Sequence, residues 1–499
     1  MTFFQKSLQA LFVVIFSFSL GCSLNKKKVA VSPLPNIIHV MTDDGAADML
    51  PGSARYPFLQ MPAVARLMRE GAIAENFFVS YSLCSPSRAS VLTGTYAHTH
   101  GVTTHDTGMK MEPDWKKLPP FPGLLRDAGY TTAFVGKIHM ADLTGTNQVR
   151  PGYDLWFSFT GQGEYFNPLL NENGREFRAQ GYMTDLLHER ALRWLENERD
   201  PAKPFCLILW HKAVHEDFSP APRHRDQYAG EPLLPPPDGS HRETFRGKPE
   251  WLRARALGPG HTGPIPPELP EKPWVPRTNN ILGMLRGMSA VDEGLGKILE
   301  YLDQANLATN TIVIFTSDNG SYLGSHTFYD KRLGYETAIR IPFILRYPAK
   351  VPAGSRMTEM GVNVDTSQTL LDWANVPAPA HQQGRSLAAA FEGKSTTSRE
   401  DFLIEYYIDD HYPYAGTNMV AVRTPDWKLV QAEDAKPENI ELYDLKKDPA
   451  ELNNLASDPA YALVLRDMLT RFARLQEETR FTWDRDWRRR EIVEQKKSR

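Results

Sequence analysis

Short apolar runs alternate with stretches of helical spacing along most of the chain. Runs of strand length cover residues 36–41, 73–79, 131–135, 204–210 and 311–315. Apolar positions recur with helical spacing at 61–70, 121–128, 184–198 and 281–304. Strands and helices that alternate at these lengths are typical of a parallel sheet with crossover helices. The pattern predicts an α/β fold with a large central mixed, mostly parallel sheet flanked by helices.

Charged and polar side chains follow four of these predicted strands at their carboxyl ends. They are Asp43 and Asp44, Lys137, His211 and His215, and Asp318 and Asn319. Parallel strands end at the same edge of a sheet, and ligands bind in the crevice beyond that edge. The sequence therefore predicts one polar site assembled from four separate segments.

Two parts of the chain depart from this alternation. Residues 219–280 are rich in proline and have little periodicity. Because predicted strands of the same sheet flank them, we interpret them as an insertion over the site within a catalytic domain of residues 35–375. Residues 376–499 are predicted to form a smaller C-terminal subdomain, built on a short antiparallel sheet and a helix. Its expected strands are 420–423, 427–430 and 441–445, and its expected helix is 461–478.

The N-terminus has the pattern of an export signal. Its apolar stretch, residues 10–20, is shorter than the roughly 20 residues that span a bilayer and fits the core of a signal peptide. We therefore predict a signal peptide at 1–21, a tether at 22–34, and export to the periplasm or cell surface. The sequence SLGC at 19–22 is similar to a bacterial lipoprotein cleavage box, although its Leu lies one position late. Lipidation of Cys22, which would attach the protein to a membrane, and plain cleavage nearby both stay open.

Composition narrows the class of protein. Of the 499 residues, 23% are charged and 41% hydrophobic, with a net charge of -3, which is ordinary for a globular domain and argues against nucleic acid as a partner. The chain has three cysteines. Cys206 lies in an apolar run and is expected to be buried in a strand. Exported proteins usually place cysteines in disulfides, so the lone Cys84 in a Ser/Thr-rich loop needs another explanation.

The segment 84–94, CSPSRASVLTG, provides that explanation. It resembles the signature of the formylglycine-dependent (type I) sulfatases of the alkaline-phosphatase superfamily. The resemblance implies that a maturation enzyme oxidises Cys84 to formylglycine. A hydrated aldehyde carries two hydroxyl groups, so one oxygen attacks sulfur and the other remains available to expel sulfate. An ordinary serine would instead be left as a sulfate ester that is hard to hydrolyse.

The resemblance also implies a metal site. Its ligands would be Asp43, Asp44, Asp318 and Asn319, together with the modified residue formed from Cys84. Oxygen ligands without histidine nitrogen suit a hard cation. The habit of the family favours Ca²⁺, and Mg²⁺ stays open. Such a cation would polarise the sulfate oxygens and favour ionisation of the attacking hydroxyl.

Further catalytic roles follow from the same resemblance. Arg88, Lys137 and Lys331 would neutralise the charge that spreads over the sulfate oxygens in the transition state. His139 would bind the hydrate and take the proton that lets sulfate leave. His215 would protonate the leaving alcohol, with Lys331 as the alternative donor. Proton transfer near neutral pH is work that suits histidine.

Substrate-binding residues are harder to predict from sequence. His211 and His326 are candidates by their positions in the family pattern. Residues 150–173 and the 219–280 insertion are candidate loops for glycan preference. Three aromatic side chains in the first loop would either stack on sugar rings or pack locally: Trp156, Tyr165 and Phe166.

The expected function is removal of sulfate from an ester, on a sulfated carbohydrate. A second reading keeps the architecture and makes the chain a phosphodiester or phosphonate monoester hydrolase of the same superfamily. A third reading is an inactive glycan-binding lipoprotein, which the presence of every expected catalytic residue disfavours. Residues 45–48 differ from the commonest continuation after the paired aspartates, so the adjoining substrate pocket is not predictable from the family.

Overall fold

The computed structural model describes residues 34–104, 111–141, 149–237, 244–258, 261, 263–270, 275–394, 396–408 and 417–483. The predicted signal peptide, most of the tether and Cys22 lie outside the described residues. Within them, no helix is long and apolar enough to cross a membrane.

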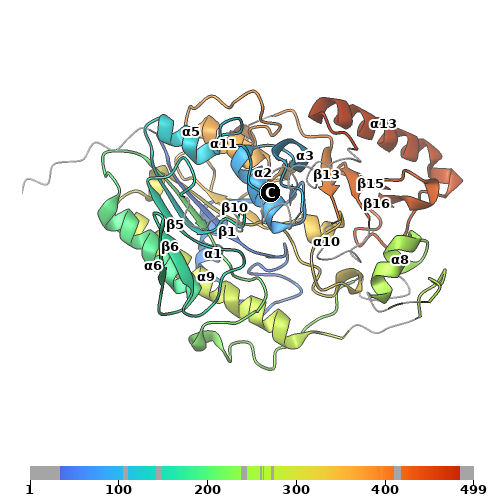
Figure 1. Cartoon of the computed structure of the whole chain (residues 1–499), viewed down its shortest axis with the longest axis horizontal. Coiled ribbons are helices and arrows are strands. Elements are labelled where there is room, and N and C mark those ends of the chain that lie inside the picture. The colour runs from blue at the N-terminus through green and yellow to red at the C-terminus, as the bar shows by residue number, and fades with distance from the viewer. Residues whose placement is uncertain are drawn as a thin grey trace, which may run out of the picture.

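A ten-stranded mixed sheet forms the centre of the larger part of the molecule (Figure 1). Its strands, in spatial order, are β11 (Ser355–Met357), β2 (Ala72–Ala74), β10 (Phe343–Arg346), β9 (Thr311–Ser317), β1 (Asn36–Thr42), β8 (Phe205–Trp210), β4 (Thr131–Lys137), β5 (Leu155–Phe159), β6 (Leu169–Glu172) and β7 (Arg175–Arg178). The five strands from β9 to β5 are mutually parallel. The predicted fold class is confirmed.

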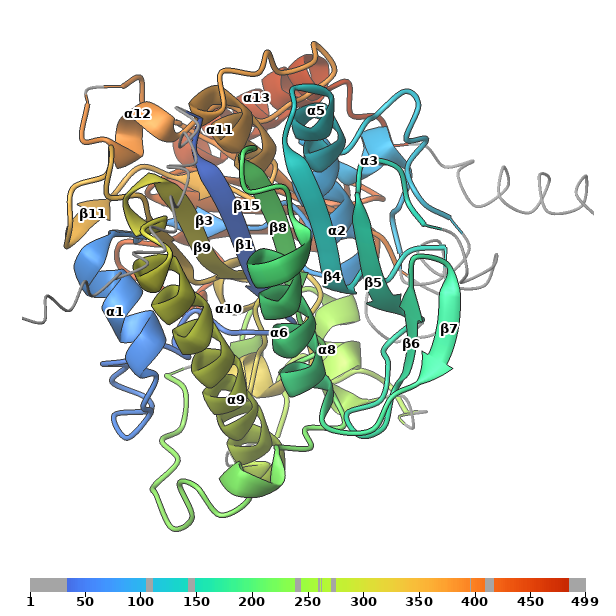
Figure 2. The ribbon, with the colours of Figure 1, turned by 90° about the vertical axis from the view of Figure 1, so that its left-hand side faces the viewer.

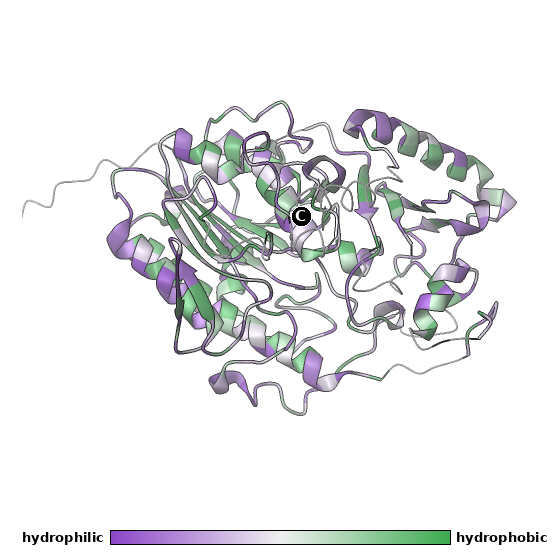
Figure 3. Ribbon diagram, in the orientation of Figure 1, coloured by the Kyte–Doolittle hydropathy of each residue, from purple (hydrophilic) through white to green (hydrophobic). Residues whose placement is uncertain are grey.

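Helices cover both faces of this sheet (Figure 2). One face carries α1 (Pro62–Glu70), α6 (Met183–Arg193) and α9 (Thr278–Gln304); the other carries α2 (Cys84–Thr93), α5 (Phe121–Asp127) and α11 (Asp365–Trp373). Neighbouring strand residues point to opposite faces, so Ile37 joins one hydrophobic core and Ile38 the other. Because both faces are covered, the central strands are mostly apolar, and the polar positions gather on the outer sides of the helices (Figure 3).

Two local predictions need correction. Residues 73–79 do not form one strand: the chain turns at 75–76, and β2 is followed by the separate two-residue strand β3 (Phe77–Phe78). The predicted helix 184–198 is α-helical only to Arg193 and then widens into a π turn. Strands β5, β6 and β7 were not predicted: β5 pairs in parallel with β4, and β6 and β7 follow it as antiparallel neighbours.

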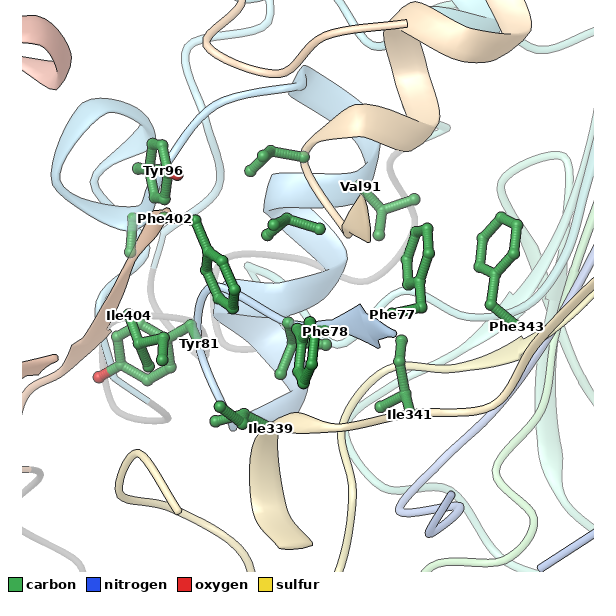
Figure 4. Packing of buried hydrophobic residues seen from close by; sticks show 14 of the residues in the cluster. Phe77, Phe78, Tyr81, Val91, Tyr96, Ile339, Ile341, Phe343, Phe402 and Ile404 are labelled. Carbon is green, nitrogen blue, oxygen red and sulfur yellow. The ribbon is translucent and has the colours of Figure 1, made fainter. Parts of the chain in front are cut away.

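The C-terminal part is a four-stranded antiparallel sheet packed against a long helix, as predicted. The strands are β13 (Phe402–Tyr406), β14 (Met419–Arg423), β15 (Trp427–Ala432) and β16 (Ile440–Asp444), and the helix is α13 (Ala462–Thr479). Strand β13 was missed. It packs on the larger part through aromatic side chains, where the rings of Phe78 and Phe402 lie 5.2 Å apart (Figure 4). Further helices are α3 (Ala97–His100), α8 (Glu250–Leu257), α10 (Glu336–Ile339) and α12 (Ala388–Phe391).

Candidate active site

The acidic residues of the site come from the ends of two adjacent parallel strands. Thr42 of β1 is in register with Ser317 of β9, so the residues that follow each strand face one another. The backbone N–H of Asp44 donates to Asp318 Oδ1 at 3.1 Å, and Asn319 Nδ2 donates to Asp44 Oδ1 at 2.7 Å. The sheet register therefore joins the two clusters that the sequence analysis predicted to meet.

Cys84 is the first residue of α2 and lies against this acidic cluster. Its thiol donates to Asp43 Oδ1 at 3.4 Å, and Lys331 Nζ donates to its Sγ at 3.1 Å. Burial, reinforced by the charge of Asp43, raises the pKa of the thiol well above its ordinary value. The partial positive charge of a helix N-terminus favours negative charge at this position. Lys331 and the helix N-terminus thus direct positive charge at residue 84 and oppose the effects of burial and of Asp43.

The oxygen atoms fit a divalent cation. Ligand atoms of Asp43, Asp44 and Asp318 all lie within 4.8 Å of one another. Asn319 Oδ1 is buried and accepts no hydrogen bond from the described residues. Burial raises the pKa of Asp44 to about 7, and the neighbouring Asp43 and Asp318 add to that effect. Crowded carboxylates beside an unpaired amide oxygen form a hard-ion donor set, which matches the predicted metal ligands.

Three buried cations surround the carboxylates. The guanidinium of Arg88 donates to Asp318 Oδ2 through Nε at 2.9 Å and to the backbone oxygen of Lys137 at 2.7 Å. Lys137 Nζ donates to Asp43 Oδ2, and Lys331 Nζ donates to both oxygens of Asp44 at 2.6 and 2.8 Å. Burial alone would raise the pKa of Asp43, but Lys137 and the other cations outweigh it and hold that pKa well below its usual range.

His215 lies at the edge of the same cluster. Its Nδ1 is 3.0 Å from the backbone oxygen of Glu216, and its Nε2 is 3.8 Å from Asp44 Oδ2. Tyr165 fixes this segment by donating its hydroxyl to the backbone oxygen of His215 at 2.6 Å. The Nε2 side of the ring therefore faces the reaction centre. His139 is buried two residues beyond Lys137.

The two predicted substrate-binding histidines face other neighbours. The ring of His211 stacks on His188 at 4.7 Å, although its backbone oxygen lies 3.5 Å from Arg88 Nη2. The ring of His326 lies 4.5 Å from that of Tyr335. Both rings are buried, and their substrate-binding roles stay predictions.

Among the three loop aromatics, two pack locally. Trp156 is fully buried and stacks on Phe134 with ring centroids 4.6 Å apart. Tyr165 is buried against the His215 segment as described above. Phe166 is 44% exposed, so it alone of the three keeps a large accessible surface for a sugar ring.

Two polar residues at the site were not identified from the sequence. Gln162, which follows β5, accepts a hydrogen bond from Lys137 Nζ at 2.5 Å. Lys212 lies over the ring of Tyr165 at 4.7 Å and donates to the backbone oxygen of Glu216 at 2.7 Å. Burial lowers the pKa of Lys212 to about 8. Like the other site residues, Gln162 lies beyond the carboxyl end of a parallel strand. This position can be recognised from the sequence only after β5 has been predicted.

Comparison with known proteins identifies the family. The family model described as Sulfatase matches residues 35–376, and the model described as N-sulphoglucosamine sulphohydrolase, C-terminal, matches residues 324–478. The chain therefore belongs to the sulfatase family. It is an enzyme, a sulfuric ester hydrolase.

Individual relatives agree with this assignment. An N-acetylglucosamine-6-O-sulfatase of Bacteroides thetaiotaomicron is 30% identical, over 94% of this chain and 90% of the relative. A solved structure of a protein in complex with its substrate D-glucosamine-2-N,6-O-disulfate is 28% identical with a TM-score of 0.77, covering 90% of this chain and 98% of that one. A phosphonate monoester hydrolase of Agrobacterium radiobacter has a TM-score of 0.68 at 20% identity, covering 89% of this chain and 96% of that one, which shows a shared fold alone.

Proposed function

We propose that the chain removes sulfate from a sulfated amino sugar of a glycan, through a formylglycine formed from Cys84. The observation that carries the proposal is the position of Cys84 Sγ, 3.4 Å from Asp43 Oδ1 and 3.1 Å from Lys331 Nζ. It lies among three carboxylates and three cations, all of them buried except the partly buried Asp44. The names of the relatives at about 30% identity favour glucosamine 6-O-sulfate as the first substrate to test.

The charges of the site support an anionic substrate. Arg88, Lys137 and Lys331 balance the three carboxylates, so a bound divalent cation leaves the site with an excess of positive charge. A sulfate monoester is an anion, and sulfate as it leaves is a dianion. Fixed positive groups in a buried site favour both forms and stabilise the charge that develops between them.

Each cation has a separate task in this mechanism. Arg88 is held rigidly by Asp318 and the backbone oxygen of Lys137, so it orients sulfate beside residue 84. Lys137 and Lys331 neutralise the remaining sulfate oxygens from two sides. The metal, when bound through Asp43, Asp44, Asp318 and Asn319, supplies Lewis-acid polarisation of the sulfate. We assign it to Ca²⁺, with Mg²⁺ as the alternative.

Two histidines handle protons. His215 directs Nε2 into the site and gives a proton to the departing sugar oxygen, which becomes a hydroxyl as the S–O bond breaks. His139 accepts the proton from the second hydroxyl of the hydrated formylglycine, which lets sulfate leave and restores the aldehyde. Both steps are general acid–base catalysis by side chains that need only hold or release one proton.

Export and maturation belong to the same proposal. A formylglycine-generating enzyme would act on the 84–94 segment before folding buries it. The signal-peptide pattern at 1–21 supports a periplasmic or cell-surface protein, with lipidation of Cys22 as the proposed attachment to the membrane.

A turnover panel tests the substrate class. Purified protein from a host with maturation machinery is assayed on glucosamine 6-O-sulfate, an aryl sulfate, an aryl phosphodiester and an aryl phosphonate. We expect turnover of glucosamine 6-O-sulfate and of the aryl sulfate, and only weak turnover of the phosphorus esters. Higher kcat/KM on a phosphorus ester than on every sulfate ester would contradict the proposal.

A further inference from the structure

A cavity lies away from Cys84, next to the end of α13. Its volume is about 570 Å³, and it is lined by the start of α3, the segments around 380–385 and 397–401, and the last turns of α13 with Arg480. Cys84 begins α2, whereas the cavity adjoins Tyr96 beyond the other end of that helix. Ten helical residues at a rise of about 1.5 Å each separate the two by about 15 Å. The cavity is therefore not part of the site around Cys84.

The carboxylates that line this cavity are already paired. Asp401 Oδ2 accepts from Arg474 Nη2 at 2.5 Å and from Arg471 Nη1 at 2.9 Å. Glu478 accepts from Arg474 at 2.8 Å, and Glu400 accepts from Arg471 at 3.3 Å. These contacts pair each of the three lining carboxylates with an arginine of α13.

Two further guanidinium groups that line the cavity, those of Arg385 and Arg399, come from outside α13. Arg399, whose side chain is 10% exposed, donates to the buried Asp365 at 2.5 Å, and its Nε has no hydrogen-bond partner among the described residues. Arg385 donates to the backbone oxygen of Thr397 at 3.1 Å and lies 3.9 Å from Glu359. Burial and the charge of Arg399 both lower the pKa of Arg385. Of these two guanidinium groups, only that of Arg399 donates a hydrogen bond to a carboxylate.

We propose that this cavity binds an anionic sugar unit of the glycan, remote from the unit that loses its sulfate, through Arg385 and Arg399. Guanidinium groups bind sulfate and carboxylate oxygens with paired, charge-assisted hydrogen bonds. The volume suits a sugar unit better than a single inorganic ion. Thr397 and Ser398 add neutral polar groups to the lining, of the kind that bond sugar hydroxyls.

This inference rests on the proposed glycan substrate and extends it. A chain held at two places gains affinity because the second contact becomes intramolecular once the first has formed. The consequence is a preference for long chains over short ones, with chemistry at residue 84 unaffected. Short substrates that reach only the catalytic site would not contact Arg385, so replacing Arg385 would not change their binding.

The test compares matched variants in a Cys84→Ala background, which prevents turnover. Titration calorimetry with a sulfated glucosamine-containing octasaccharide should show affinity reduced about tenfold or more by Arg385→Met, the worth of a charge-assisted hydrogen bond. Arg466→Met, which removes the same charge from an exposed position on α13 outside the cavity, should leave affinity unchanged. With Cys84 intact, Arg385→Met should leave turnover of an aryl sulfate unchanged.

Two outcomes would overturn the inference. One is equal octasaccharide affinity with and without Arg385→Met. The other is inorganic sulfate binding that is lost in Arg385→Met and is as tight as octasaccharide binding, which would make the cavity a simple anion site. If Arg385→Met does not fold, as judged by its melting temperature, Arg385→Gln, which also removes the charge, replaces it and should show the same loss. Failure of the wild-type enzyme to desulfate any sugar would refute the proposed function, and the octasaccharide titration remains a separate result.

Discussion

Replacement of His215 by alanine should have an effect that depends on the leaving group. A sugar hydroxyl is a poor leaving group and needs a proton as the S–O bond breaks, whereas a nitrophenolate scarcely needs one. The structure gives His215 the position of a single proton donor: Nδ1 is taken by the backbone oxygen of Glu216, and Nε2 faces the site 3.8 Å from Asp44. Lys331, the other candidate donor, is already engaged by both oxygens of Asp44 and by Cys84.

The size of the effect follows from these contacts. If His215 is the donor, His215→Ala removes the whole general-acid contribution, about 10²–10⁴-fold in kcat/KM on a sulfated sugar. That range corresponds to about 3–5 kcal/mol of transition-state stabilisation. On 4-nitrophenyl sulfate the loss should be less than about tenfold, because general-acid catalysis contributes little to an activated leaving group.

The assay measures kcat/KM for both substrates on the same preparation of each variant. His211→Ala is the matched control, since His211 lies in the same segment as His215. The ring of His211 stacks on His188 and does not contact the carboxylate cluster. Its effect should be similar on the two substrates. Equal losses for His215→Ala on the sugar and the aryl sulfate would refute the reasoning, make His215 a sulfate-binding group, and transfer the proton-donor role to Lys331.

Three further predictions follow from the site and its support. Arg88→Ala should reduce kcat/KM by a similar factor, at least about 10²-fold, on both substrates, because Arg88 serves the sulfate they share; a selective loss on the sugar would contradict this role. Chelation by EDTA should lower activity, and Ca²⁺ or Mg²⁺ should restore it better than Zn²⁺, given an oxygen donor set; full recovery with Zn²⁺ alone would disprove the ligand assignment. Asp292→Ala should lower the free energy of unfolding by about 2–3 kcal/mol, because it leaves the buried N–H groups of Ala63 and Val64 at the start of α1 unpaired. Both unfolding free energies are measured by denaturant titration. The control is Glu293→Ala, which removes an exposed ion pair from α9, the helix that also carries Asp292, and should cost less than about 1 kcal/mol.

The parts of the fold that the sequence predicts well are those whose burial is uniform. Strands β1, β8 and β9 are buried on both faces, so each is a mostly apolar run that ends where the polar site begins. Because parallel strands end at one edge of the sheet, the sequence alone then predicts that Asp43, Asp44, Asp318 and Asn319 lie close together. Cys206 is buried in β8 as expected.

The parts that were missed depend on contacts distant in sequence. Strands β6 and β7 carry exposed and charged positions, so their pattern resembles a loop until β5 provides a pairing edge. Gln162 was not predicted as a site residue, because β5 was not predicted and the position of Gln162 after a strand was therefore not recognised. The positions of His326 beside Tyr335 and of Trp156 beside Phe134 were equally unpredictable, since each contact joins segments whose relative placement only the folded chain defines.

The mass of the peptide that carries residue 84 tests the central claim most directly. Trypsin should release residues 70–88, which contain no internal Lys or Arg. In active protein from a host with maturation machinery, this peptide should be about 18 Da lighter than the cysteine form, the difference between a thiol and the aldehyde that the mechanism requires. The fraction of the lighter peptide should rise in proportion to specific activity, and Cys84→Ala should fold and have no turnover. Full activity in protein whose residue 84 is entirely unmodified cysteine would contradict the account.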